Sequence, residues 1–462
     1  MITTADASLV LARALCCGAD FAELFFEHTQ TRSMRYLDGR VYEATGGVLH
    51  GAGVRVMLGR DCAYATTNDT SLLGLQEVAL RAAMALGELR AVGGEEPVKL
   101  YQTLVFDRHR AALPLGDVTS KRQVHLLRDL HNAVRDCPGI SQAAAGCQLT
   151  TQHVTIANST GLYIRDERNR ARVSIQAVAG DGSQNQTAFQ GPGALRGAEF
   201  LDSIDPEALG RETAEVALTM LHAPECPAGR FPVVMAGGFG GVLIHEACVH
   251  SLEATSVSRG ASEFADKLGR PIADPCVTII DDGTIPNAWG SGNIDDEGNQ
   301  TQRNVLVRDG VLEGFLVDTL GGRKMGMAPN GCARRQSYAY APTSRMSNTF
   351  VEAGQSSEDE MFAAVDHGLY AKRMGGGSVS PATGEFNFAV AEGYWIQDGK
   401  ITHPVRGATL VGRGSEVLMN INKVGREVTF GQGMCGSRSG TVPTDVGQPT
   451  LLLRELTVGG RG

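Results

Sequence analysis

The sequence lacks the features that mark a membrane-spanning or nucleic-acid-binding chain. No window approaches 18 uninterrupted apolar residues, so we expect no transmembrane helix and no membrane partner. The 42 Lys and Arg residues never form a run of five, and 51 Asp and Glu residues bring the net charge to −9. This balance argues against a nucleic-acid partner. Residues 1–24 have neither a basic segment nor a small-residue cleavage site, so we expect no signal peptide and a cytoplasmic location.

Disulfide-forming and nucleotide-binding patterns are also missing. The ten cysteines contain no C-x-x-C pair and are scattered over 462 residues, which is typical of a protein from a reducing compartment. The sequence has no G-x-x-x-x-G-K-[ST] and no G-x-S-x-G string, and no G-x-G-x-x-G follows a strand in a dinucleotide-binding context. Phosphate binding and a serine nucleophile therefore have no support.

The composition is that of a folded chain rich in tight turns. Apolar residues make up 42% of the sequence, and the length suits two or three domains. Gly is abundant at 58 residues, without periodicity. Asp38-Gly39, Asp309-Gly310 and Asp398-Gly399 each separate two apolar-rich segments. Each pair predicts an antiparallel hairpin, because both central residues of a type I′ turn need positive φ.

Helix and strand patterns alternate in the first half of the chain. Apolar residues recur every three or four positions, with Ser, Thr or Asp near each start, in residues 4–17, 71–91, 118–136 and 205–222. Strand-like stretches occupy 21–28, 40–67 and 140–190. In the second half we expect hairpins and short helices near 238–253, 358–373 and 414–424.

The patterns predict an α+β fold with a change of character near residue 223. The segment 222–234 contains three prolines and is the best linker candidate. A weaker boundary lies near residue 98, after a Gly-Gly-Glu-Glu-Pro stretch. We therefore expect residues 1–98 and 99–222 to form the two parts of a mixed α/β N-terminal region. Residues 223–462 should form a large, β-rich, antiparallel C-terminal domain.

The most specific local motif is His245-Glu246-Ala247-Cys248-Val249-His250. Two imidazoles and an adjacent carboxylate are what a hydrolytic zinc site uses: the histidines hold the metal and the carboxylate takes a proton from the bound water. The five-residue spacing does not fit one face of a regular helix. We predict a π-type bulge that returns both histidines to one side. Cys248 should point away from the ligands and pack in the core.

A zinc site needs a third protein ligand, and the spacing alone leaves it open to any distant Cys, His, Asp or Glu. Cys435 is a candidate because it lies in the glycine-rich, polar stretch TFGQGMCGSRSGTVP, where a core cysteine is out of place. We expect this stretch to be a loop. Either Zn²⁺ or Fe²⁺ would accept two imidazoles and a thiolate.

Long ordered blocks of the chain resemble the TldD/TldE (PmbA) metalloprotease family. The blocks include HEACVHSLEATSVSRGASEFADKLG, VTIIDDGT, GSGNIDDEGNQTQRNVLVRDG, ARRQSYAYAPTSRMSNTFVEAG, TGEFNFAVAEGYWIQDGKITHPVRGATLVG and CGSRSGTVPTDVGQPTLLLRELTVGG. The resemblance covers nearly all of the C-terminal half and extends more weakly through LDGRVYEATGGVLHGAGVRV.

The resemblance implies a set of metal ligands, a catalytic residue and a partner subunit. His245, His250 and Cys435 match the metal ligands of the TldD-type subunit, and Glu246 matches its catalytic acid/base. The TldE-type subunit lacks these residues and is inactive. Two subunits of the family enclose a chamber that admits flexible peptides. The implied partner is therefore a TldE/PmbA-like subunit or a second copy of this chain.

One position departs from the family pattern. Val249 stands where the family usually has Gly before the second His. A β-branched residue does not readily adopt positive φ. The turn is therefore either a wide helical turn that tolerates valine or a left-handed turn that would disturb the metal geometry.

Other polar residues near these blocks have two interpretations each. Glu253 is either a hydrogen-bond partner of a ligand imidazole or a solvated helix-end carboxylate. Asp281-Asp282-Gly283 and Asp295-Asp296-Glu297 could form an acidic rim, but turns are the favoured interpretation. Arg334-Arg335 is either a clamp for a peptide carboxylate or an exposed pair.

The leading hypothesis is a zinc-dependent metallopeptidase that hydrolyses unstructured peptides inside a dimeric chamber. The alternative is a non-catalytic, peptide-binding or regulatory chamber subunit with a structural metal. A structural zinc has four protein ligands, whereas a catalytic zinc keeps one position open. A metal-dependent hydrolase of another amide bond is a third possibility that the sequence does not separate from the first.

Overall fold

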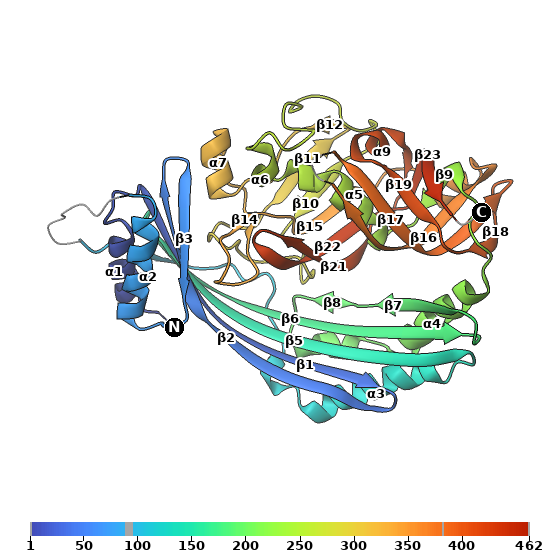
Figure 1. Cartoon of the computed structure of the whole chain (residues 1–462), viewed down its shortest axis with the longest axis horizontal. Coiled ribbons are helices and arrows are strands. Elements are labelled where there is room, and N and C mark those ends of the chain that lie inside the picture. Colours follow the sequence, from blue (N-terminus) through green and yellow to red (C-terminus); the bar gives the residue numbers. More distant parts are fainter. Residues whose placement is uncertain (1, 88–95, 381–382, 461–462) are drawn as a thin grey trace.

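A computed structural model describes residues 2–87, 96–380 and 383–460. The chain forms two halves that lie one above the other in Figure 1, with the C-terminal half facing the long strands of the N-terminal half. Helices and strands of both halves agree with the predicted α+β class, and most strand pairs are antiparallel.

One large sheet organises the N-terminal half. Its strands are β1 (Phe21–Leu37), β2 (Arg40–Leu58), β3 (Asp61–Thr67), β4 (Tyr101–Thr103), β5 (Ile140–Asn158), β6 (Leu162–Gly180), β7 (Asn185–Gln190) and β8 (Gly193–Ala194). The order is β3-β2-β1-β5-β6-β4, and β7 and β8 also pair with β6. The four long strands curve beneath the C-terminal half (Figure 1).

The predicted Asp-Gly hairpins are confirmed. Asp38 and Gly39 have φ of 50° and 77° and join β1 to β2, with Leu37 opposite Arg40. Asp309-Gly310 and Asp398-Gly399 likewise combine two positive φ angles. Asp tolerates this region better than most residues and Gly adopts it freely, so each pair fixes the register of the strands beside it.

The four helices of the N-terminal half begin where their caps predict. They are α1 (Thr4–Ala14), α2 (Leu72–Met84), α3 (Ser120–Arg135) and α4 (Pro206–His222), with short 3₁₀ turns η1 (Leu115–Asp117) and η2 (Ala198–Ser203). The caps Thr3, Ser71, Thr119 and Asp205 accept backbone N–H groups of the first turns. The helix predicted over 71–91 ends earlier, and residues 88–91 lie outside the described part of the chain.

The helices cover separate parts of the sheet. Helices α1 and α2 pack on β1 and β2 around a core that includes Val10, Leu24 and Val78. Helices α3 and α4 pack along β5 and β6 around Leu127, Val173 and neighbouring residues. In Figure 1 helix α3 lies on the side of the long strands away from the C-terminal half. The opposite face of those strands is therefore left to face the C-terminal half.

The C-terminal half is mainly β, as predicted. Its strands are β9 (Gly229–Met235), β10 (Ile279–Asp282), β11 (Arg303–Arg308), β12 (Val311–Leu312), β13 (Ala333–Arg334), β14 (Thr343–Ser344), β15 (Asn348–Val351), β16 (His367–Val379), β17 (Glu385–Gln397), β18 (Lys400–Val405), β19 (Thr409–Arg413), β20 (Ile421–Val424), β21 (Thr429–Ser437), β22 (Gly440–Gln448) and β23 (Leu451–Gly459). Strands β16-β9-β23-β19-β17-β18 form one sheet, with β20 beside β23, and β12-β11-β10-β15-β22-β21 form another. A single apolar cluster extends between them.

Short helical segments connect these strands. They are η3 (Phe239–Gly241), α5 (Val242–Ala247), η4 (Val249–Leu252), α6 (Ala254–Val257), α7 (Thr319–Met325), α8 (Glu358–Phe362) and α9 (Gly414–Asn420). The helix predicted over 358–373 is wrong beyond Phe362, because residues from His367 onward pair with β9 and β17. The helix predicted over 414–424 ends at Asn420, where β20 begins.

The linker predicted over 222–234 is shorter than expected. Helix α4 ends at His222, and β9 already begins at Gly229 and pairs with β23 and β16. The linker is therefore limited to residues 223–228. The division into residues 1–98, 99–222 and 223–462 stays a prediction.

Buried ion pairs join the two halves. Arg55 on β2 lies 2.5 Å from Glu23 of β1 and 2.7 Å from Glu297 of the C-terminal half. Arg335 reaches back to Glu23 at 2.7 Å. The side chains of all four are at most 2% exposed. Within the described residues, no helix has the length and apolar character needed to span a membrane.

Candidate metal centre

The first two candidate ligands lie on a helix that breaks between them. His245 and Glu246 belong to α5, which ends at Ala247. Cys248 then adopts φ −123° and ψ −60°, and His250 lies in the 3₁₀ turn η4. The predicted π-type bulge is therefore wrong: an α-to-3₁₀ break at Cys248 turns His250 toward His245.

The residues at this helix break are closely packed. Cys248 is fully buried, as predicted for a packing residue. The backbone of Ala247 lies against Gly414, where an added Cβ would be 1.8 Å from the Ala247 carbonyl oxygen. Val249 lies in η4 and is not among the non-glycine residues with positive φ. Of the two alternatives for Val249, the structure has the one that tolerates valine.

The third candidate ligand comes from a distant strand. Cys435 lies on β21, opposite Val442 of β22, so the prediction of a loop at this position is wrong. Its Sγ is 3.2 Å from His245 Nε2 and 3.2 Å from His250 Nε2. The two imidazole rings are edge to face, with centroids 5.0 Å apart. All three donor atoms lie within 4.8 Å of one another.

These donor atoms suit one small transition-metal ion. Zn–N bonds near 2.05 Å and a Zn–S bond near 2.3 Å in a tetrahedron place N and S about 3.5 Å apart. The observed separations of 3.2 Å are close to this value. His245 and Cys435 are buried, and among the described residues the donor group consists of three side chains. A tetrahedral ion held by these three side chains would keep one position for water or substrate, as catalytic zinc sites do.

Glu246 stands at the accessible side of this group. Its Oε2 is 3.6 Å from His250 Nε2, and its side chain is 27% exposed. The carboxylate is therefore close to the donor atoms without being enclosed with them. A carboxylate in this position can accept a proton from a water molecule held between the donors and the substrate.

Glu253 holds the other nitrogen of His250. Its Oε1 lies 3.3 Å from His250 Nδ1, and the carboxylate is 6% exposed. Of the two interpretations of Glu253, the imidazole partner fits the structure and the solvated carboxylate does not. A carboxylate at Nδ1 fixes the ring orientation and leaves Nε2 to face the donor group.

Arg345 supports both sides of the site and has no local sequence motif. Its Nη2 donates to the Cys435 carbonyl oxygen at 2.5 Å, and its Nη1 donates to the Ser439 hydroxyl and the Gly440 carbonyl. Its Nε lies 3.9 Å from Glu253 Oε1. The only clue in the sequence is that Arg345 belongs to a block that resembles the family. Full burial of this guanidinium fixes the β21–β22 turn beside the donor group.

The charges of the site are strongly coupled. Burial raises the pKa of the Cys435 thiol, but the adjacent His245 and His250 more than offset this effect and lower it to about 3. Burial lowers the pKa of His250, whereas Glu253 and Cys435 raise it well above its usual value. These directions describe a thiolate beside an imidazolium, and a bound cation would replace the His250 proton.

The remaining acidic candidates do not form an exposed rim. Asp282 accepts the backbone N–H of Thr284 at 2.8 Å, which is the turn that we predicted after β10. Asp295, Asp296 and Glu297 are each 3% exposed. They are buried between the two halves rather than displayed at a surface.

The two arginines of the Arg334-Arg335 pair have different environments. Arg335 is buried and donates to Glu23 and to the Asp296 carbonyl oxygen. Arg334 lines a cavity between the halves and donates to the Met346 carbonyl oxygen at 2.6 Å. The interpretation of an exposed pair is wrong for both, because neither side chain lies on the outer surface.

Comparison with known proteins identifies the family. Family models described as PmbA/TldA metallopeptidase domain 1, central domain and C-terminal domain match residues 22–86, 113–221 and 228–460. The chain belongs to the PmbA/TldD metallopeptidase family. The resemblance seen in the sequence is thereby confirmed across both halves of the chain.

Individual relatives agree with this family assignment. A protein named metalloprotease TldD homolog from Haemophilus influenzae is 36% identical over 96% of this chain and 93% of its own length. A metalloprotease from Methanothermobacter thermautotrophicus is 35% identical over 96% of both chains. The crystal structure of TldE from Thermococcus kodakarensis has the same fold, with a TM-score of 0.76, 17% identity and coverage of 96% and 97%.

Proposed function

We propose that the chain is a zinc-dependent metallopeptidase that hydrolyses unstructured peptides. The observation that carries this proposal is the convergence of His245, His250 and Cys435 with Glu246 beside them. Two neutral imidazoles and a thiolate suit Zn²⁺, and Fe²⁺ is the second choice. The names of the relatives, metalloprotease among them, support the same class of enzyme.

A bound zinc ion would supply Lewis acidity toward the scissile carbonyl and toward the attacking water. The rest of the chemistry falls to the side chains. Glu246 accepts a proton from the water as it attacks the carbonyl carbon and then delivers that proton to the leaving amine nitrogen. Glu253 keeps Nε2 of His250 directed at the donor group.

The proposal includes a second subunit, either a TldE/PmbA-like chain or another copy. Residues 40–51 of β2 pair with β1 on one side, while β3 pairs with β2 from Ala52 onward. This part of β2 is the open edge of the sheet and carries exposed Tyr42 and Val48, at 61% and 65%. An open apolar strand edge favours addition of another strand. A pair joined here would enclose a chamber for flexible peptide.

We place this enzyme in the cytoplasm. The ten cysteines all lie in the described part of the chain and form no disulfide there, which is typical of a reducing compartment.

The proposal is tested with Glu246→Ala. We expect purified parent protein loaded with zinc, alone or with its partner subunit, to hydrolyse an unstructured casein-derived peptide. The substitution should lower the rate by about 10²-fold to 10⁴-fold and leave the zinc content unchanged. Glu313→Ala, at an exposed carboxylate of the same half, is the matched control. Unchanged hydrolysis by Glu246→Ala with full zinc content would overturn the mechanism.

The second candidate function is a non-catalytic, peptide-binding chamber subunit with a structural metal. The thiolate in the donor set favours it, since structural zinc sites are rich in cysteine. The coordination number decides between the two functions. Four protein ligands by X-ray absorption spectroscopy would support the structural metal, whereas three ligands and one water would support the enzyme.

A further inference from the structure

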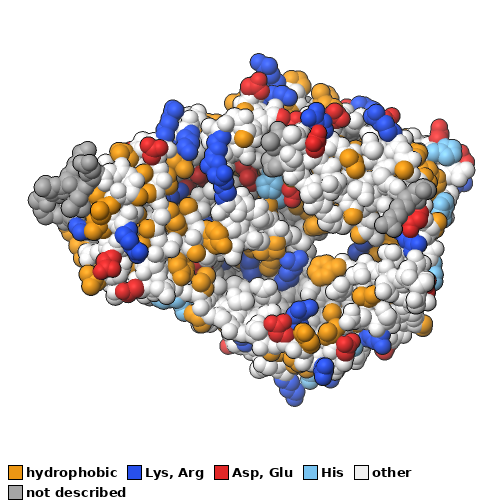
Figure 2. Space-filling model, viewed as in Figure 1, with side chains coloured by type: hydrophobic (Ala, Val, Ile, Leu, Met, Phe, Trp, Pro, Cys, Tyr) orange, Lys and Arg blue, Asp and Glu red, His pale blue; other side chains and the backbone are white. Residues whose placement is uncertain are grey.

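A second polar site lies between the two halves, away from the donor group. It is a cavity of about 500 Å³, which is within the usual range for small-ligand sites. None of His245, Glu246, His250 and Cys435 is among its lining residues. Figure 2 shows the molecule hollowed between its halves, with Lys or Arg side chains at the hollow.

One wall of the cavity is the free face of the N-terminal sheet. Arg168, Arg170 and Arg172 alternate along β6, so their side chains point to the same face. Register places Arg168 opposite Gln152 and Arg170 opposite Thr150 on β5. This spacing of arginines at every second position was visible in the sequence and was missed there.

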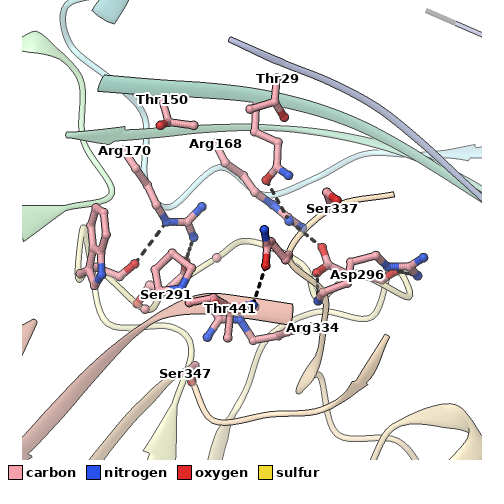
Figure 3. Close-up of a pocket in the computed structure, with 18 of the residues that line it drawn as sticks. Thr29, Thr150, Arg168, Arg170, Ser291, Asp296, Arg334, Ser337, Ser347 and Thr441 are labelled. Atoms are coloured by element: carbon pink, nitrogen blue, oxygen red, sulfur yellow. Dashed lines mark hydrogen bonds and ion pairs between the residues drawn. The ribbon is translucent and has the colours of Figure 1, made fainter. Parts of the chain in front are cut away.

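The other wall comes from the C-terminal half. It includes Trp289, Ser291, Arg334, Ser347 and Thr441. Figure 3 shows Arg170 and Arg334 reaching into the space between these two walls. Met434 of β21 also lines the cavity. It adjoins Cys435 in the strand, so the two side chains point to opposite faces of β21, and the cavity is separated from the donor group by that strand.

Three guanidinium groups in this cavity are held by carbonyl oxygens. Arg170 donates to the carbonyl oxygens of Trp289 and Ser291 at 3.2 and 2.9 Å. Arg172 donates to two further carbonyl oxygens, and Arg334 donates to that of Met346. Among the described residues, no carboxylate forms an ion pair with any of these three. A guanidinium normally stays charged and can form two parallel hydrogen bonds to an oxyanion.

The three acidic residues that line the cavity, Glu27, Asp295 and Asp296, are already held by other groups. Asp295 accepts the backbone N–H groups of Glu297, Asn299 and Ala333. Asp296 pairs with Arg168 at 2.6 Å. Glu27 accepts hydrogen bonds from Thr29, Gln152 and the Tyr338 N–H at 2.6 to 2.8 Å. These carboxylates therefore do not neutralise Arg170, Arg172 or Arg334 directly.

The electrostatics of the two central arginines agree with this geometry. Burial, with Arg334 and Arg168 nearby, lowers the pKa of Arg170 to about 9, although Asp296 and Asp166 act in the opposite direction. Burial and the nearby Arg345 lower the pKa of Arg334 to about 10, despite Asp296. Burial and neighbouring arginines destabilise the charged forms of Arg170 and Arg334, and a bound anion would offset this destabilisation.

We propose that this cavity binds a carboxylate group of a peptide between Arg170 and Arg334. A planar carboxylate matches the guanidinium fork. The hydroxyl and amide side chains around it, such as Thr150 and Gln152, can hydrogen-bond the adjoining peptide groups. The choice of a peptide as the source of the carboxylate rests on the proposed function. The carboxylate is either the terminal group of the peptide or an Asp or Glu side chain.

Trp289 provides a direct readout of binding. It lines the cavity, and Arg172 lies over its ring at 5.6 Å from the centroid. The chain contains two tryptophans, so Trp395→Phe leaves Trp289 as the only indole. The fluorescence of Trp289 is then titrated with three acetylated Gly-Ser peptides: a free acid, its C-terminal amide, and an amide that contains one Glu.

We expect the free acid, the Glu peptide or both to bind at least about tenfold more tightly than the neutral amide, the difference that a charged hydrogen-bond pair provides. Arg170→Gln and Arg334→Gln should each remove this preference, whereas Arg308→Gln, at an exposed side chain of the C-terminal half, should keep it. Equal binding of acid and amide peptides to the unsubstituted cavity would overturn the proposal, and this comparison does not depend on the variants folding. Displacement of the acid peptide by inorganic phosphate at equal concentration would also overturn it, in favour of a general oxyanion site.

The same titration separates this inference from the proposed function. It is repeated after zinc removal and with Glu246→Ala, where peptide hydrolysis should be lost and the acid preference retained. Hydrolysis without acid preference would overturn the cavity assignment alone. Acid preference in a zinc-loaded parent protein that hydrolyses no peptide would support a carboxylate site and overturn the peptidase.

Discussion

Glu253 Oε1 lies 3.3 Å from His250 Nδ1, while Nε2 of the same ring lies 3.2 Å from Cys435 Sγ. One imidazole thus links a buried carboxylate to the donor group. The arrangement orients the ring before any metal arrives and increases the basicity of the nitrogen that faces the donors.

Glu253→Gln should therefore weaken metal binding without removing a ligand. We expect zinc affinity to fall by about 10-fold to 100-fold, measured by competition with a chromogenic chelator. Glu313→Gln, at an exposed carboxylate, is the matched control. An unchanged affinity in Glu253→Gln would show that Glu253 does not position His250.

Cys435→Ser should remove the thiolate from the metal site. Protein loaded with Co²⁺ should show the absorption band of a cobalt–thiolate bond, and the substitution should abolish it. Cys276→Ser, at the exposed free cysteine, should leave the band intact. Retention of the band in Cys435→Ser would exclude Cys435 as a ligand.

Arg55→Met should destabilise the contact between the two halves. The substitution leaves Glu297 buried without its cation and removes one of the two cations beside Glu23, which costs about 3 to 5 kcal/mol. The measurement is the denaturant dependence of unfolding. Arg35→Met, which removes an exposed pair with Glu43, should cost less than about 1 kcal/mol. Equal effects of the two substitutions would contradict the buried network.

The open edge of β2 predicts a dimer, and positive charges placed on this strand should disrupt it. Tyr42→Lys with Val48→Lys places two cations on the exposed strand and should raise the dissociation constant at least about tenfold. Sedimentation velocity measures the change, with Leu104→Lys at another exposed apolar position as the control. A monomeric parent chain would exclude the homodimer and leave the TldE-like subunit to be tested by co-expression.

Because Asp445 is buried, we expect the folded protein to lose stability as the pH rises from about 4 to about 6. Burial raises the pKa of Asp445 to about 6 in the folded chain, from the ordinary value of 3.8 that applies to the unfolded chain. Between these values the folded chain holds more protons at this position, so the free energy of unfolding decreases with rising pH, by roughly 3 kcal/mol in all. Asp445→Asn should remove this contribution and leave that of the buried Asp318, whose pKa burial also raises to about 6.

Chemical denaturation of both proteins between pH 4 and pH 7 measures the effect of Asp445. Asp202→Asn, at an exposed carboxylate, should keep the pH dependence of the parent. The same slope in the parent and in Asp445→Asn would show that another group titrates in this range.

Local sequence rules predicted the parts of the fold that depend on neighbouring residues. The Asp38-Gly39 turn and the capped starts of α3 and α4 follow from backbone preferences that act within a few positions. The same rules failed at β16, where residues after Phe362 were assigned to a helix. Pairing with β9 and β17 overrides that local preference, and strand pairing between distant segments leaves no local pattern.

The candidate site shows the same division. The sequence alone singled out His245, Glu246 and His250 by their spacing and Cys435 by its polar surroundings and family resemblance, because residue type fixes which atoms can bind a metal. Only the tertiary structure decided that the Cys435 sulfur, 190 positions away, lies 3.2 Å from His245 Nε2 and that the helix breaks at Cys248. It also decided that Arg170 and Arg334 line the cavity between the halves without forming an ion pair with a described carboxylate. Burial, strand register and the contact between halves set these distances and charges, and they are properties of the packed chain rather than of any local segment.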